Sequence, residues 1–256
     1  MPSVVTSRAG AVLTIALNRP EVYNAFNREL HSALHDALGE AAAPEIRAVV
    51  ITGAGKAFCA GHDLKEFQEL AGSVRDVLEE SYHPNVRRIR GLEKPVIAAV
   101  NGVAAGAGLS LACACDIRLA SAAAAFVPGF AGIGLVPDAG GTWFLERLLG
   151  YARAFEWMSS NRRLAADEAL EWGLVSAVLP EDDFAAGVAE TASRWAATPT
   201  RAVAFAKRLF EHAHHASLEE QLALEAELQQ QAIQTADFRE GVAAFLEKRP
   251  PRFTGS

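Results

Sequence analysis

The chain has 256 residues, of which 50% are hydrophobic and 21% are charged, a balance typical of a folded globular protein rather than a disordered one. Its formal net charge of −7 argues against a general nucleic-acid-binding protein, because such proteins carry an excess of Lys and Arg. The three cysteines, Cys59, Cys113 and Cys115, have no metal-type spacing, so we expect reduced thiols in a cytoplasmic protein. The first ten residues contain no apolar run, and no secretory signal is expected.

Short apolar runs divided by turn residues predict an α/β fold with many short strands. The alternating residues 4–5 and 12–17 indicate a hairpin around Gly10. Asn27 is a favourable N-cap residue, and the leucines spaced after it indicate a helix. Further short strands are predicted at 48–52, 57–61, 116–121, 125–127 and 174–179.

Helical patterns fill the intervals between these runs and dominate the end of the chain. Residues 64–92 are rich in charged side chains and predict a surface helix or a mobile lid. Short helices are predicted at 140–150, 154–158 and 166–172. From residue 182 to about 248 the pattern is helical, with one break at Pro199 and another around residues 215–217. We therefore expect a core of strand and helix units over 1–195 and a helical C-terminal part over 196–256.

The stretch from Asn101 to Asp138 is rich in small residues, and Asp116 and Asp138 are its only acidic side chains. Before it, residues 96–100 indicate a buried strand, which turns into a helix beginning near Gly106. Backbone N–H groups at such a helix start can face a ligand oxygen, with the helix dipole behind them. This is the physical basis of an oxyanion hole, and Asp138 is the candidate acid or base beside it.

Residues 96–115 carry no charge and match a membrane span in length. Their start is β-branched and strand-like, and Asn101, Ser110 and three glycines interrupt their apolar character. We therefore favour a buried strand, turn and helix over a membrane-spanning segment, and we expect no membrane association.

Several short motifs occur in a fixed order along nearly the whole chain. They are 17–20 with 24–25, 55–64, 94–95, 101–108, 115–118, 134–142 and 244–249. In these motifs the chain resembles the crotonase superfamily, also called the enoyl-CoA hydratase/isomerase family. The resemblance implies a spiral of repeated β-β-α units with a C-terminal helical trimerisation region, assembled as a homotrimer or a dimer of trimers. It also implies acyl-CoA thioester substrates and no further cofactor, since the coenzyme A is part of the substrate.

The resemblance assigns an oxyanion hole of two backbone N–H groups to His62 and Ala107. Ala107 stands where the family usually has glycine, but an alanine still offers its N–H group. The hydratases of the family use two glutamates to handle water, and this sequence has Ser110 and Phe130 at the matching positions. Because neither side chain can replace a glutamate base, the resemblance argues against straightforward hydration.

Asp138 matches a position at which some isomerases of the family carry a catalytic aspartate. Residues 134–143 resemble most closely the bacterial phenylacetate-pathway isomerases, which interconvert an epoxide-CoA and an oxepin-CoA and also shift enoyl-CoA double bonds. One carboxylate suffices for such a shift, because it can remove a proton at C2 and return it at C4. Phe130, Leu135 and Val136 would raise its pKa if they surround it. The alternative is that Asp138 is only the N-cap of the following helix.

Motif matching also implies a set of substrate-binding residues. They are Lys56, Ala60, Asp63, Leu64, Lys65, Gly106, Ser110, Phe130, Phe245 and Lys248. The lysines at 56 and 65 would bind the CoA phosphates, and the last two residues would reach the CoA of a neighbouring subunit. Each lysine could equally be a solvated surface residue, and Asp63 could equally be a turn residue. Asp116 is expected to be structural, and the histidines at 212–215 lack the spacing of a metal site.

The sequence therefore predicts an acyl-CoA isomerase with Asp138 as the acid/base and the N–H groups of His62 and Ala107 as the oxyanion hole. An enoyl-CoA hydratase or a diverged thioester hydrolase is the alternative enzyme. An acyl-CoA-binding protein without catalytic activity is the alternative of another class. Metal ions, nucleic acids and membranes are not expected partners.

Overall fold

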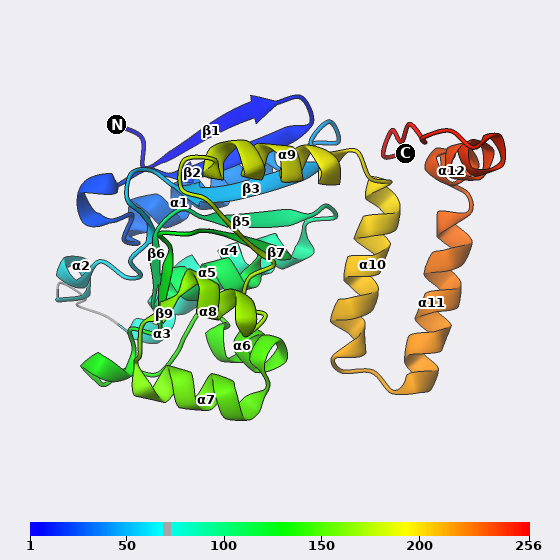
Figure 1. Ribbon diagram of the computed structural model, residues 1–256. Coiled ribbons are helices and arrows are strands. Elements are labelled where there is room, and N and C mark those ends of the chain that lie inside the picture. The colour runs from blue at the N-terminus through cyan, green and yellow to red at the C-terminus, as the bar shows by residue number, and fades with distance from the viewer. Residues whose placement is uncertain (69–72) are drawn as a thin grey trace.

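The computed structural model describes residues 1–68 and 73–256, which form two sheets with helices around and beside them (Figure 1). A six-stranded sheet has the order β1-β2-β3-β5-β7-β10, and a four-stranded sheet has the order β4-β6-β8-β9. The larger sheet consists of β1 (Val4–Ala9), β2 (Val12–Leu17), β3 (Ala48–Gly53), β5 (Val96–Val100), β7 (Ile117–Ser121) and β10 (Ala177–Leu179). The smaller sheet consists of β4 (Ala57–Cys59), β6 (Val103–Ala105), β8 (Ala125–Val127) and β9 (Leu164–Ala165).

From β3 to β8, consecutive strands alternate between the two sheets, and this alternation gives the chain a spiral course. The pairs β3 and β4, β5 and β6, and β7 and β8 each place one strand in each sheet. From β2 onward the neighbours in the larger sheet are parallel, whereas β1 and β2 form an antiparallel hairpin. The predicted hairpin is confirmed, and Gly10 adopts a φ of 59° in its turn.

Twelve α-helices lie among the described residues. They are α1 (Arg28–Glu40), α2 (Leu64–Gln68), α3 (Val74–Val77), α4 (His83–Gly91), α5 (Ala107–Ala114), α6 (Gly141–Leu149), α7 (Tyr151–Ser160), α8 (Ala166–Glu171), α9 (Phe184–Ala196), α10 (Thr200–Ala213), α11 (Leu218–Ala232) and α12 (Ala236–Glu247). Shorter turns are the 3₁₀ turns η1 (Pro20–Val22) and η3 (Ala131–Ile133) and the π-helical turn η2 (Leu78–Tyr82). None of these helices has both the length and the apolar character needed to cross a membrane.

Helices cover both faces of the larger sheet. α9 lies along one face, where Val188 packs among residues of β2, β3, β5 and β7 (Figure 1). α1 belongs to the core on the other face, and Leu30, Leu34 and Leu38 are fully buried there. Asn27 caps α1 as predicted, because its side chain accepts a hydrogen bond from the Leu30 N–H group at 2.9 Å.

Three sequence predictions need correction or restriction. The strand predicted over 174–179 extends only over β10, because Leu174 and Val175 are buried in the turn after α8 rather than in a strand. The break between α11 and α12 and the short strand β9 were not predicted. The charged segment 64–92 is helical in α2, α3, η2 and α4, and its residues 69–72 lie outside the described part of the chain.

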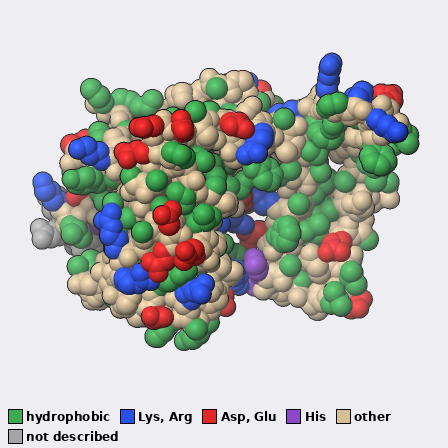
Figure 2. All heavy atoms as spheres, in the orientation of Figure 1, with side chains coloured by type: hydrophobic (Ala, Val, Ile, Leu, Met, Phe, Trp, Pro, Cys, Tyr) green, Lys and Arg blue, Asp and Glu red, His purple; other side chains and the backbone are tan. Residues whose placement is uncertain are grey.

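α10 and α11 form an antiparallel pair beside the core, with α12 and the C-terminus at its far end (Figure 1). Hydrophobic side chains gather on this helical arm (Figure 2). They include Phe210, Leu218, Leu222, Phe245 and Leu246, which are between 48% and 83% exposed. Exposed apolar surface of this extent on one element is typical of an interaction surface.

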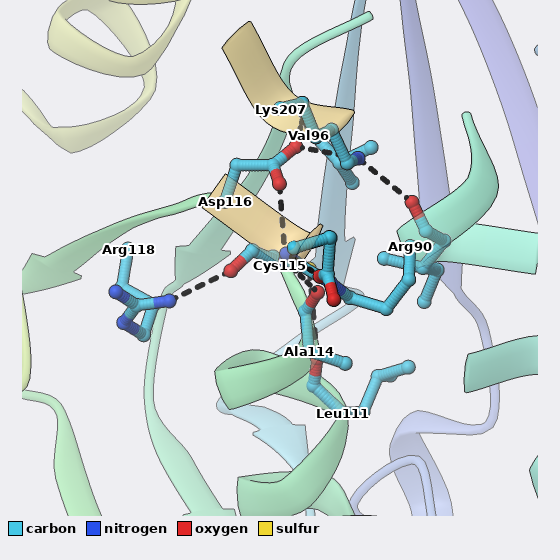
Figure 3. Close-up of polar contacts among 10 residues, drawn as sticks. Arg90, Val96, Leu111, Ala114, Cys115, Asp116, Arg118 and Lys207 are labelled. Atoms are coloured by element: carbon cyan, nitrogen blue, oxygen red, sulfur yellow. Dashed lines mark hydrogen bonds and ion pairs between the residues drawn. The ribbon is translucent and has the colours of Figure 1, made fainter. Parts of the chain in front are cut away.

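A partly buried ionic cluster joins the arm to the core (Figure 3). Asp116 accepts hydrogen bonds from Lys207 Nζ of α10 at 2.9 Å, from Arg90 Nη1 of α4 at 3.1 Å, and from the Val96 N–H group at 2.9 Å. Arg90 also pairs with Glu211 of α10. Asp116 is therefore structural, as the sequence predicted.

Candidate active site

A cavity of about 310 Å³ lies where the end of β4, the start of α5, the turn η2 and the loop before α6 meet. The cavity wall contains His62, Ala107 and Asp138, so the structure brings the three predicted catalytic residues together. Most of the remaining wall is apolar, and it includes Leu78 and Phe130.

The backbone around His62 and Ala107 is closely packed. Gly61 has a φ of 92°, and a Cβ atom at this position would lie 2.9 Å from the Ala105 oxygen and 3.4 Å from Ala107 N. At Gly108 a Cβ atom would lie only 2.3 Å from the Cys59 oxygen. The small residues of the 101–108 motif therefore allow the end of β4 and the start of α5 to touch.

The direction of each donor peptide is fixed by a hydrogen bond to its carbonyl group. The Gly61 carbonyl accepts from the Phe26 N–H at 2.7 Å, and a planar trans peptide then points the His62 N–H in the opposite direction. The Gly106 carbonyl accepts from the Ser110 N–H at 3.1 Å, which is the first turn of α5. The N–H groups of the first helical turn have no acceptor within their own helix, so that of Ala107 points away from α5.

Asp138 lies in a turn formed by left-handed backbone, with φ of 50° at Ala139 and 80° at Gly140. The Asp138 carboxylate does not cap α6, because Gly140 is the N-cap residue and no side chain bonds the first turn. The turn is closed instead by the backbone, with the Gly141 N–H donating to the Asp138 oxygen at 2.8 Å. The interpretation of Asp138 as only a side-chain cap is therefore wrong.

The carboxylate of Asp138 is desolvated on one side. Its Oδ1 atom is buried and has no hydrogen-bond partner among the described residues. Burial disfavours the charged form and raises the pKa of Asp138 from 3.8 to about 6, although a hydrogen bond from the residue's own backbone acts in the opposite direction. Phe130 and Leu135 line the same cavity, as predicted, but Val136 is 79% exposed and lies on the opposite side of the loop.

Ser110 does not line the cavity, although motif matching implied that it would. Its side chain is buried behind the loop, and its hydroxyl donates to the Asp138 carbonyl oxygen at 2.9 Å. A Cβ atom on Gly141 would lie 2.6 Å from the Ser110 Oγ atom, so α6 is packed directly against this side chain. The serine therefore holds the backbone that carries Asp138, and a longer side chain would displace α6.

The other predicted substrate-binding residues fall into two groups. Ala60, Leu64 and Gly106 line the cavity. The remaining ones, Lys56, Asp63, Lys65, Phe245 and Lys248, do not line it.

Among the latter group, Asp63 forms an ion pair with Arg19 at 3.1 Å and accepts from the Lys65 N–H at 3.2 Å. The side chains of Lys56 and Lys65 are exposed. Phe245 and Lys248 lie at the end of the helical arm, so a single chain does not bring them to the cavity (Figure 1).

Tyr82 is a cavity residue that the sequence did not predict. It is 4% exposed, and its hydroxyl lies 2.5 Å from His62 Nδ1. Burial and the neighbouring Asp138 raise the pKa of Tyr82, so the phenol is uncharged near pH 7. The available sequence signal was that Tyr82 is the one tyrosine in the charged 64–92 segment.

Among residues 1–68 and 73–256, no group of three or more His, Cys, Asp or Glu side chains could hold a metal ion. His212 Nδ1 lies 3.0 Å from Gln221 Oε1. His214 packs edge-on against Trp143, with ring centroids 5.1 Å apart.

Comparison with known proteins gives consistent matches over nearly the whole chain. The model of the enoyl-CoA hydratase/isomerase family matches residues 7–256. A Rhodobacter capsulatus protein named "Probable enoyl-CoA hydratase" is 47% identical over 245 residues, which are 94% of this chain and 93% of the relative. The Escherichia coli K12 protein named 1,2-epoxyphenylacetyl-CoA isomerase is 43% identical over 249 residues, 95% of each chain.

A solved structure extends the likeness to three dimensions. The crystal structure described as an enoyl-CoA hydratase/isomerase from Mycobacterium abscessus is 37% identical to this chain, with a TM-score of 0.94. It is matched over 99% of this chain and 100% of that one. The α/β fold predicted from the motifs, a crotonase-like spiral, is confirmed.

Proposed function

The chain belongs to the enoyl-CoA hydratase/isomerase family, and we propose that within this family it is an acyl-CoA isomerase. The observation that carries the proposal is that Asp138 is the only carboxylate among the described residues of the cavity wall. Its raised pKa and apolar surroundings suit a group that both takes and returns a proton.

The N–H groups of His62 and Ala107 form the proposed oxyanion hole. Both residues line the cavity, and the carbonyl of each donor peptide is already bonded elsewhere. Fixed donors of this kind stabilise negative charge on a thioester oxygen, and the start of α5 adds the positive end of a helix dipole. The proton at C2 of the acyl chain becomes more acidic as a result.

In the proposed reaction, the Asp138 carboxylate removes a proton from C2 of a 3-enoyl-CoA. The electrons of the C–H bond move toward the carbonyl, giving a dienolate whose oxygen is held by the two N–H groups. The protonated Asp138 then returns the proton to C4, and the double bond ends between C2 and C3. No atom is gained or lost, so the step needs no co-reactant.

A hydratase is the second candidate, because one relative carries that name. Adding water needs groups that position and activate a water molecule at C3. Phe130 presents only hydrocarbon to the cavity, and Ser110 is turned toward the Asp138 backbone. These two residues support double-bond movement over hydration.

The acyl group that fits this cavity is apolar, since aliphatic and aromatic side chains make up most of its wall. The name of the Escherichia coli relative favours a ring-bearing acyl-CoA, including an epoxide that rearranges with ring expansion.

We further propose that the helical part 196–256 assembles the chain as a cytoplasmic homotrimer or a dimer of trimers. Its exposed hydrophobic side chains support this proposal (Figure 2).

The test of the proposed function is the Asp138→Asn variant. We expect 3-enoyl-CoA isomerisation to fall by about 10³-fold or more, while acyl-CoA affinity changes by only about two- to threefold, because the amide keeps the shape but cannot accept the proton. Asp36→Asn, which removes an exposed carboxylate of α1, is the matched control. Full isomerase activity in the Asp138→Asn enzyme, or rapid hydration of crotonyl-CoA by the unmodified enzyme, contradicts the proposal.

A further inference from the structure

The turn η2 directs one aromatic side chain into the cavity wall. Tyr82 ends this π-helical turn and is buried, whereas Glu79 and Glu80 of the same turn are exposed. π-helical turns are rare, and they occur frequently at functional sites. The Tyr82 hydroxyl meets the His62 side chain, with 2.5 Å between the Oη and Nδ1 atoms.

The Tyr82 ring is held in place by two other rings. Its centroid lies 4.0 Å from that of His31 and 5.5 Å from that of Phe26, with both pairs in edge-on orientation. His31 and Phe26 are themselves stacked, at 4.5 Å between centroids and 10° between planes. The packing of the Tyr82 ring therefore holds its hydroxyl at a fixed position beside His62.

Phe26 also binds the backbone on both sides of His62. Its N–H donates to the Gly61 oxygen at 2.7 Å, and its carbonyl accepts from the Asp63 N–H at 2.8 Å. These two bonds hold the peptide groups on either side of His62, and the contact with Tyr82 holds the His62 side chain. Backbone and side chain of His62 are thus tied to one aromatic cluster.

We propose that Tyr82 is a positioning residue for the oxyanion hole, acting through the side chain of His62 on the direction of the His62 N–H group. This inference rests on the proposed function, which assigns that N–H to the thioester oxygen. A donor stabilises the developing charge only when it points at the place where the charge forms. A displacement of about 1 Å can cost roughly 100-fold in rate, so an anchor for this residue has catalytic value.

Both partners of the contact are uncharged near pH 7, because burial raises the pKa of Tyr82 and lowers that of His62. Tyr82→Phe removes the hydroxyl and keeps the ring packed on His31 and Phe26. We expect this variant to lose about tenfold in kcat with KM within twofold, since donor direction matters more to the enolate than to the bound substrate. Tyr151→Phe, at a 68% exposed tyrosine on α7, is the matched control and leaves both constants unchanged.

A spectroscopic readout separates positioning from a loss of stability. The absorption of 4-(dimethylamino)cinnamoyl-CoA shifts to longer wavelength when hydrogen bonds polarise its thioester carbonyl. We expect the bound probe to lose a measurable part of this red shift in Tyr82→Phe and to keep all of it in Tyr151→Phe. An unchanged red shift in a folded Tyr82→Phe enzyme overturns the proposal.

A double-mutant cycle identifies the route of the effect. His62→Ala retains the backbone N–H but removes the side chain that Tyr82 contacts, so Tyr82→Phe should have no further effect in that background. Additive losses overturn the proposal, because they mean that Tyr82 acts independently of the His62 side chain. If Tyr82→Phe does not fold, His62→Ala alone must reproduce the reduced red shift.

The probe also separates this inference from the proposed reaction. A red shift that depends on Tyr82, in an enzyme without isomerase activity, supports the positioning role and refutes the isomerase. Isomerase activity with no dependence on Tyr82 supports the reaction and refutes the positioning role.

Discussion

The burial of Asp138 should make the protein less stable at the pH at which the enzyme works. Its pKa is raised by burial from 3.8 to about 6, a difference equivalent to roughly 3 kcal/mol. Because the side chain is partly exposed, we reduce the expected effect to about 2 kcal/mol. The Asp138→Asn variant, which removes the charge and keeps the shape, should recover this free energy.

The sign of the effect follows from where the proton is lost. Below about pH 4 the carboxyl is protonated in both the folded and the unfolded chain, so its burial costs no charge. Between about pH 4 and 6 the unfolded chain ionises first and the folded state loses stability, and above about pH 6 the loss is complete. The melting temperature of Asp138→Asn minus that of the unmodified protein should therefore rise by about 4–8 °C between pH 4 and pH 8.

Thermal unfolding of both proteins across this pH range measures the difference, and Asp36→Asn controls for the change in net charge. The same group should govern activity, so kcat/KM for isomerisation should fall about tenfold per pH unit below about pH 6 and be constant above it. A difference in melting temperature that does not vary with pH would refute the reasoning, and so would an activity profile whose midpoint lies away from about pH 6, where the stability change is complete.

Two further predictions concern residues that act through others. Ser110→Ala removes the hydrogen bond to the Asp138 carbonyl, so kcat should fall severalfold with KM unchanged and stability should drop by about 1–2 kcal/mol; Ser159→Ala, on exposed surface, is the kinetic control. Asp116→Asn removes the anion that pairs with Lys207 and weakens the pairing of Arg90, which retains Glu211, so urea denaturation should show a loss of about 2–4 kcal/mol. An Asp116→Asn protein of unchanged stability would mean that the cluster contributes nothing to folding.

Periodicity and turn residues were enough to predict most of the fold. Asn27 and the leucines after it specify α1 because an amphipathic helix repeats its apolar side chains at a fixed interval. The small residues at 101–108 predicted a helix beginning near Gly106, and the structure begins α5 at Ala107, with Gly108 packed against β4. The strand predicted over 174–179 was too long. Leu174 is buried in a turn, and a local sequence pattern does not distinguish an apolar residue buried in a turn from one buried in a strand.

The candidate site was predictable where it depends on motifs and unpredictable where it depends on side-chain direction. Asp138 and Phe130 face the cavity as expected. Ser110, in α5, points to the Asp138 backbone, and Val136, in the loop before α6, points to solvent. Both directions depend on how this loop packs, which local sequence patterns do not specify. Tyr82 reaches the cavity through a π-helical turn, whose extra residue has no signature in hydrophobic periodicity.

The residues proposed to activate the thioester and the residue proposed to move the proton belong to different segments. His62 and Ala107 contribute backbone groups at the junction of β4 and α5, whereas Asp138 contributes a side chain from the loop before α6. A backbone donor survives almost any substitution of its own side chain, while a carboxylate is replaced by a single codon change. Under the proposed assignment, a changed loop at 128–140 would alter the proton-transferring group and leave the two backbone donors in place.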